Sequence, residues 1–355
     1  MILKPTRAIC LQISILGILC TSLPAAETAP EKKPGPAKPE KPKSPYQKFL
    51  EKGRLRDFPA RDWKKAFHHN SLCYRVRTNT SPEVAEYVGV LMDAVHYHYC
   101  RLFGAGGTRK ANINVFRTHK EMAAWAQNHC KYNLRKTVIG FYATKYGGSI
   151  CVVWKKLYGE HPQTVLMHEG THQFVSSVWG ARTLPIWLNE GFAVYFENSK
   201  FDGRKLETGR IPAKRLRRLQ SQMKTGKHVT LAKLFATKPK DFRADAYGSA
   251  WAFVYWLAHS AKGQRHRVHQ ICLQKFVADC RRNRRDGKQL AVYLGISMKD
   301  LEKKWKEWVL KLDPADPYGG TRKTPKKKDQ NGREDKSGGK KACAPAPAGP
   351  PPATG

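Results

Sequence analysis

Acidic residues are scarce in this chain. It has 28 Asp and Glu against 65 Lys and Arg, which gives a formal net charge of +37. A positive charge of this size indicates the kind of binding partner and not the fold, because a cationic surface attracts anionic polymers and membranes. The 355 residues also lack an internal repeat, a Gly-rich phosphate loop and a motif around a Ser or Cys nucleophile. These absences exclude a repeat protein, a P-loop nucleotide hydrolase and the common Ser and Cys hydrolases.

No pair of cysteines has the spacing of a CxxC motif or a zinc knuckle, so cysteine ligation of a metal is not expected. Two alternatives stay open for the six cysteines in the body of the chain. They can form disulfides in an oxidising compartment, or they can be buried free thiols. These cysteines are Cys73, Cys100, Cys130, Cys151, Cys272 and Cys280, and Cys343 follows in the tail.

A long hydrophobic run is missing too. Basic residues precede the apolar stretch Ile9–Leu19, which is too short to span a membrane, and Ala25 and Ala26 follow it. This order predicts a secretory signal peptide over residues 1–26, hence a periplasmic, cell-envelope or extracellular protein. Cys20 offers a lipoprotein alternative, but the residue before it is not the small one that lipoprotein signals usually carry, which favours ordinary cleavage.

Composition divides the remaining chain into a folded body and two polar ends. Residues 27–45 are a Pro/Lys-rich linker and residues 313–355 a basic, Pro-rich tail, so both are predicted to be disordered. The domain spans residues 46–312, with a basic insertion at residues 199–228. This insertion is either a solvated flap or an attachment to anionic envelope polymers or lipid surfaces. With Phe201 as its one aromatic residue, it does not favour nucleic acid.

Hydrophobic periodicity predicts an α+β fold, with a small N-terminal mixed sheet followed by a mostly helical C-terminal half. Two β-rich runs form a predicted hairpin over residues 137–154, directly before a helix that starts near Pro162 and ends at Gly180. A short strand is predicted at residues 113–116. Helices are predicted at residues 81–103, 119–129, 188–198, 230–235, 244–260, 267–281 and 297–311.

The chemistry of the chain is concentrated in VLMHEGTHQFV, residues 165–175. His168 and His172 are four residues apart, so on a helix both imidazoles point to one side and can bind one ion. Glu169 projects about 100° away from His168 and can reach a water beside that ion. A catalytic zinc site needs a third protein ligand, and Glu190 in WLNEGFAVYFE, residues 187–197, is a candidate across a turn.

HEGTH followed by WLNEGFAVYFE resembles the gluzincin metallopeptidases, and in particular the exported bacterial families called peptidase MA-like. The resemblance implies a zincin-like fold in which the small sheet packs on the helix with the HExxH motif. It implies that His168, His172 and Glu190 bind one Zn²⁺ per chain. AYGSAWAFVYWL, residues 246–257, resembles the helix that carries a transition-state tyrosine, which would be Tyr247 here.

The resemblance has limits. The Gly-x-Met-Glu-Asn element with which gluzincin aminopeptidases bind a free amine is absent, and the hairpin contains GFYATKYGGSICVVW instead. The gap between His172 and Glu190 is one residue shorter than in those enzymes. Aminopeptidase specificity is therefore not expected.

Together these features predict an exported zinc-dependent metallopeptidase that acts on a peptide or protein. In this hypothesis a zinc-activated water hydrolyses the peptide bond, Glu169 is the general base and Tyr247 stabilises the oxyanion. The alternative is a non-catalytic, cationic, envelope-associated binding protein with a structural or vestigial zinc site. Glu169 argues against this alternative, since zinc binding alone does not need that carboxylate.

Three further residues keep two interpretations each. Tyr247 is either the oxyanion donor or a core residue of an apolar helix. Glu197, seven residues after Glu190, either hydrogen-bonds a ligating imidazole or is solvated. Asn189 either shapes the cleft or has no role there.

Overall fold

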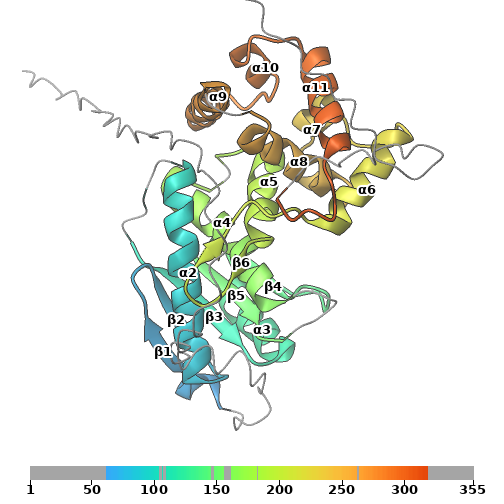
Figure 1. Cartoon of the computed structure of the whole chain (residues 1–355). Helices are drawn as coiled ribbons and strands as arrows, with labels where there is room; N and C mark the ends of the chain where they lie inside the picture. The colour runs from blue at the N-terminus through green and yellow to red at the C-terminus, as the bar shows by residue number, and fades with distance from the viewer. Residues whose placement is uncertain are drawn as a thin grey trace, which may run out of the picture. The chain divides into compact units, whose positions relative to one another are not determined.

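The computed structural model describes residues 61–103, 106, 109–144, 148–155, 161–181, 183–261 and 264–318. The predicted signal peptide, linker and most of the tail lie outside these residues, as does part of the hairpin turn. The described residues confirm the α+β class, with a sheet in the N-terminal half and mostly helices after it (Figure 1).

The main sheet among the described residues has five strands in the order β1-β2-β3-β5-β4. The β1/β2 and β4/β5 pairs are antiparallel, whereas β2/β3 and β3/β5 are parallel, so the sheet is mixed. The strands are β1 (Phe67–Asn70), β2 (Tyr74–Thr78), β3 (Ala111–Phe116), β4 (Gly140–Ala143) and β5 (Ser149–Val153). The sequence did not predict β1 and β2, because both are short and β1 (FHHN) has three polar residues in succession.

Both faces of the sheet are covered. Every residue of β5 is buried, and successive side chains of a strand point to opposite faces. Ile150 and Val152 belong to the large core under α2 (Pro82–Phe103) and α4 (Pro162–Trp179), whereas Cys151 and Val153 pack in a small cluster with α3 (His119–Trp125). The sheet is thus a central layer with helices on each side.

The hairpin β4–β5 lies directly beside α4. β4 is the edge strand of the sheet, and α4 contacts both strands of the hairpin. Gly140 makes this approach possible, because a Cβ atom there would lie 2.3 Å from Val165 Cγ1 and 3.0 Å from the backbone oxygen of Cys151. The expected packing of the sheet against the helix with the HEGTH motif is therefore present.

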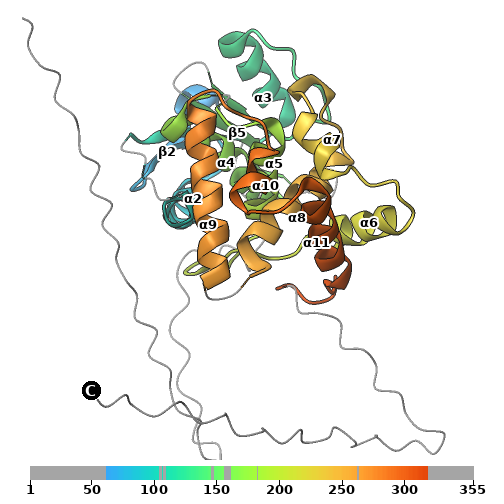
Figure 2. The same cartoon turned by 90° about the horizontal axis from the view of Figure 1, so that it is seen from above.

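The C-terminal half consists mostly of helices. In Figures 1 and 2, α6, α8 and α11 lie together, and they also contact one another pairwise. α5 connects the two halves, because it packs on α4 on one side and on α8 on the other. The helices after α4 are α5 (Ile186–Glu197), α6 (Ala213–Lys224), α7 (Leu231–Ala236), α8 (Ala246–His259), α9 (Gln264–Arg281), α10 (Gln289–Tyr293) and α11 (Met298–Lys311).

The basic segment 199–228 is more ordered than a solvated flap. It forms a two-stranded hairpin, β6 (Lys200–Phe201) with β7 (Leu206–Glu207), and then α6. α6 buries Leu216, Leu219 and Met223 against the helical core, while most of its basic side chains face solvent. The sequence did not predict this helix because it is rich in Lys and Arg, although its apolar residues have helical spacing.

No disulfide joins the six cysteines among the described residues. Cys151, Cys272 and Cys280 are buried and the other three are half-buried, so the structure agrees with the free-thiol alternative. Across the part of the chain described by the structure, no helix combines the length and the apolar character needed to cross a membrane.

Candidate metal centre

The two histidines of the HEGTH motif lie on one side of α4. Pro162 occupies the first turn of this helix, and Gly180 follows its last residue with φ = 91°, a value that favours glycine. The rings of His168 and His172 are 4.9 Å apart between centroids and are nearly perpendicular. The predicted i, i+4 arrangement of the two imidazoles is therefore present.

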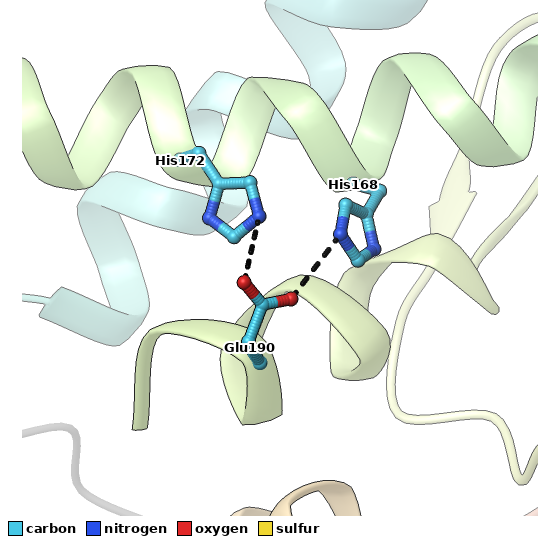
Figure 3. A group of neighbouring side chains, drawn as sticks. All are labelled: His168, His172 and Glu190. Atoms are coloured by element: carbon cyan, nitrogen blue, oxygen red, sulfur yellow. Dashed lines mark ion pairs between the residues drawn. The ribbon is translucent and has the colours of Figure 1, made fainter. Parts of the chain in front are cut away.

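Glu190 comes from α5 and completes the cluster. Figure 3 shows its carboxylate directed at both imidazoles from the neighbouring helix. Glu190 Oε2 is 3.5 Å from His168 Nε2, and Oε1 is 3.6 Å from His172 Nε2. The three residues offer ligand atoms that all lie within 4.8 Å of one another. The structure thus brings together all three predicted ligands.

The distances in this cluster fit a shared ion better than direct hydrogen bonds. Hydrogen bonds between nitrogen and oxygen are typically about 2.7–3.2 Å long, shorter than either contact. Two atoms bound to one zinc ion at about 2.0–2.1 Å, at a tetrahedral angle, are separated by roughly 3.3–3.4 Å. Glu190 Oε2 is buried and has no hydrogen-bond partner among the described residues. The group can therefore hold a metal ion, for which two histidines and a carboxylate suit zinc.

The electrostatics of the cluster favour a positive charge at its centre. Burial lowers the pKa of His168, but Glu190, Glu197 and Glu169 outweigh this effect and raise the pKa well above its usual value. Burial raises the pKa of Glu190, but His168 and His172 outweigh it and hold the pKa below its usual value. The carboxylates thus stabilise a cation here, whether it is a proton or a metal ion.

Glu197 forms a hydrogen bond with the ring nitrogen of His168 that points away from Glu190. Its Oε2 accepts a hydrogen bond of 2.7 Å from His168 Nδ1, which leaves Nε2 directed at Glu190. Such a carboxylate fixes the ring orientation of a metal ligand. Of the two interpretations of Glu197, the structure therefore shows the contact with an imidazole. His172 differs, since its Nδ1 is buried without a hydrogen-bond partner in the described part of the chain.

A cleft of about 840 Å³ opens beside the metal cluster. Glu169, His172 and Glu190 line it, so the predicted base and two of the predicted ligands face the same space. Asn189 lines it as well, which agrees with a role in shaping the cleft. Tyr142 at the edge strand β4 contributes to the same wall. A substrate in this cleft would meet the metal site and the Glu169 carboxylate together.

The cleft has basic residues at some distance along the chain from the motif. Lys238 and Arg285 line it together with Phe235 from the end of α7. No pattern in the sequence connects these residues with HEGTH, since they come from separate loops of the helical half. The lining is therefore partly apolar, with carboxylates at the metal cluster and cations contributed by these loops.

Tyr247 lies in the first turn of α8, against Glu190. Burial raises the pKa of its phenol, and the negative charges of Glu190, Glu169 and Glu197 add to this, while Arg215 opposes it. Tyr247 is also among the groups that lower the pKa of Glu190. Phe242 packs edge-on against its ring, 4.9 Å away between centroids. The structure thus places Tyr247 at the metal cluster, half-buried.

Arg215 is a member of this site that the sequence did not reveal. Its Nη2 donates a hydrogen bond of 3.0 Å to Glu197 Oε1. It lies eighteen residues after Glu197 in the basic segment, among several arginines with no distinguishing pattern. Only the packing of α6 brings Arg215, and none of its neighbouring arginines, to Glu197.

Residues 163–275 match a protein family that is described as of unknown function, DUF1570. The matched segment contains all of α4 except Pro162, and the whole of α5, α6 and α8. No curated protein matches the chain. The match covers less than half of the chain and brings no activity with it.

Proposed function

We propose that this protein is a zinc-dependent metallopeptidase of gluzincin type. The observation that carries the proposal is the convergence of His168, His172 and Glu190 beside a cleft that Glu169 also lines. A structural zinc site normally has four protein ligands, whereas three ligands facing a cleft are typical of a catalytic site. Zinc bound there supplies Lewis-acid chemistry, which makes a water nucleophilic at neutral pH and polarises a carbonyl oxygen.

Glu169 is the proposed general base. Its carboxylate accepts a proton from the attacking water and returns it to the nitrogen of the leaving amine. Tyr247, with its phenol kept protonated by burial and by nearby carboxylates, donates a hydrogen bond to the oxyanion that develops on the scissile carbonyl. Neither side chain is needed to hold the ion.

The edge strand β4 supports a peptide as substrate. It pairs with β5 on one side, and its other side borders no strand among the described residues. Tyr142 of β4 lines the cleft, so an extended peptide that adds to this edge would pass the metal cluster. Lys238 and Arg285 favour peptides with acidic residues at that end of the cleft.

Export and attachment remain part of the proposal. The signal-peptide pattern at residues 1–26 supports a location in the periplasm, in the cell envelope or outside the cell. The net charge of +37 favours association with anionic envelope polymers or lipid surfaces. The net positive charge and the cluster of His168, His172 and Glu190 are equally consistent with the competing proposal, a non-catalytic binding protein with a vestigial zinc site.

The variant Glu169→Gln distinguishes the two. We expect the mature wild-type protein and the variant to bind one zinc ion each, and only the wild type to hydrolyse a mixed peptide library, measured by mass spectrometry. Glu86→Gln, at an exposed position of α2, is the matched control and should retain activity. Zinc in both proteins with equal hydrolysis, or with none in either, would support the binding protein instead. A wild type without zinc would contradict both.

A further inference from the structure

The position of α6 is fixed by packing rather than by its charges. Leu216, Leu219 and Met223 form its buried face against α8 and α11. Gln220 Nε2 donates hydrogen bonds to the backbone oxygens of Val309 and Leu312, at 2.9 and 2.8 Å. This helix is therefore a rigid support, from which a side chain can be aimed at the metal centre.

The side chain of Arg215 extends from α6 towards the metal cluster. Its Nη2 is 3.0 Å from Glu197 Oε1, and its guanidinium carbon lies 5.7 Å from the centre of the Tyr247 ring. The Glu197 side chain is 10% exposed, whereas that of Arg215 is 38% exposed. The contact thus joins a partly solvated cation to a buried carboxylate, an arrangement in which the carboxylate depends on its partners.

Glu197 uses both of its oxygens. Oε2 accepts from His168 Nδ1 at 2.7 Å, and Oε1 accepts from Arg215. With both oxygens held, the carboxylate cannot rotate, so the His168 ring is held with Nε2 towards Glu190. Without Arg215, Oε1 would be left buried and unpaired, and Glu197 would turn to satisfy it.

Charge balance also involves Arg215. Glu169, Glu190 and Glu197 bring three negative charges to the centre, and a divalent ion neutralises two of them. The remaining charge is offset by Arg215. The other basic residues of α6 give no such contact, since Lys214, Arg217, Arg218 and Lys224 are exposed on its solvent side.

We propose that Arg215 is a positioning residue of the metal centre, which orients the ligand His168 through Glu197 and so connects the basic segment 199–228 to metal binding. The inference rests on the proposed function only for the presence of the metal, and not for the peptidase reaction. It assigns a role to a segment that otherwise resembles a charged surface element.

Zinc affinity and the visible spectrum of the cobalt-substituted protein test this role. The affinity is measured by competition with a chromophoric chelator, using Zn²⁺ alone, and the ligand-field bands of added Co²⁺ report ligand geometry. We expect Arg215→Gln to weaken zinc binding roughly 10- to 100-fold, as is typical for partners of metal ligands, and to shift the cobalt bands. Arg215→Lys keeps the charge with a single donor group and should lie between the variant and the wild type.

Arg217→Gln is the matched control, because it removes the same charge from the solvent side of α6, about 200° around the helix from Arg215. It should leave affinity and spectrum unchanged. Circular dichroism and thermal unfolding of the metal-free proteins establish that each variant folds. If Arg215→Gln does not fold, Arg215→Lys and its cobalt spectrum decide.

A double-mutant cycle separates positioning from simple charge. In a Glu197→Gln background, Arg215→Gln should change zinc affinity by less than about threefold, because the path to His168 is already cut. An equal loss in both backgrounds would overturn the proposal, as would an affinity and a spectrum for Arg215→Gln equal to those of Arg217→Gln. A wild type that binds no zinc would overturn it together with the proposed function, whereas a wild type that binds zinc without hydrolysing peptides would leave it standing.

Discussion

Within the HEGTH motif, the adjacent residues His168 and Glu169 have different roles, because successive side chains on a helix point about 100° apart. His168 and His172 are directed at Glu190, while Glu169 lines the cleft beside His172 and Glu190. The two ligands also differ in their support. His168 Nδ1 donates to Glu197, whereas the buried Nδ1 of His172 has no hydrogen-bond partner among the described residues. His168 is therefore the ligand whose orientation depends on the rest of the protein.

In the proposed mechanism, Tyr247 affects the rate of peptide hydrolysis but not zinc binding. Replacement of Tyr247 by Phe removes the hydroxyl next to Glu190 but keeps the ring that packs on Phe242. We expect zinc affinity to stay within a few-fold and kcat to fall by about 10²- to 10³-fold, as on loss of one oxyanion donor. Steady-state kinetics on a peptide cleaved by the wild type measure this. Tyr132→Phe, at an exposed tyrosine, is the control, and an unchanged kcat for Tyr247→Phe would refute the oxyanion role.

The geometry of the metal cluster depends on how closely α5 packs between α4 and α8. Gly191, next to the ligand Glu190, lies at the contact with α8. A Cβ atom there would lie 2.7 Å from the backbone oxygen of Ala250 and 2.7 Å from Val254 Cγ2. Since backbone cannot move aside as a side chain can, this glycine sets the distance between the two helices.

We therefore expect Gly191→Ala to destabilise the protein by about 1–3 kcal/mol through overpacking. The midpoint of thermal unfolding should fall by several degrees, and zinc affinity should fall with it, because Glu190 shifts with α5. Gly170→Ala is the comparison. Its added Cβ would meet Met92 Cε at 2.4 Å, the end of a flexible side chain that can give way. Equal unfolding midpoints for Gly191→Ala and the wild type would contradict this account of the packing.

Sequence patterns anticipated the helices that carry the ligands better than the elements around them. α4 begins at Pro162 and ends before Gly180, and α5 follows Pro185, so residues that favour turns and helix ends mark both helices. β1 and β2 are short, and β1 (FHHN) has three polar residues in succession, so the strands depend on pairing with their neighbours. α6 was hidden by its arginines and lysines, although Leu216, Leu219 and Met223 are spaced as a buried helical face.

A bound ion would connect the two halves of the fold. Its ligands come from α4, which packs on the sheet, and from α5, which packs on α8. Zinc should therefore stabilise the protein as a whole, since a ligand that binds only the folded state shifts the unfolding equilibrium.

Metal removal measures this effect. At a free zinc concentration of about 100 times Kd, the gain is roughly 2.7 kcal/mol, and a chelator should abolish it. Calorimetry of the loaded and chelated wild type should show the difference as a fall in unfolding temperature. The variant Glu190→Gln, which lacks a ligand, should respond little to the chelator. A wild type with the same unfolding temperature in both conditions would show that no ion is held at this site.

Residue spacing fixed only the local features of the site. The four-residue spacing of His168 and His172 set their common direction as soon as a helix formed, and Glu190 belonged to the next helix across a short turn. Tertiary structure alone decided which distant residues surround this cluster. Arg215 reaches Glu197 because α6 packs on α8, which in turn packs on α5, and Lys238 and Arg285 reach the cleft from loops of the helical half. Such contacts leave no periodic signal, since they depend on the burial of other side chains in the same elements.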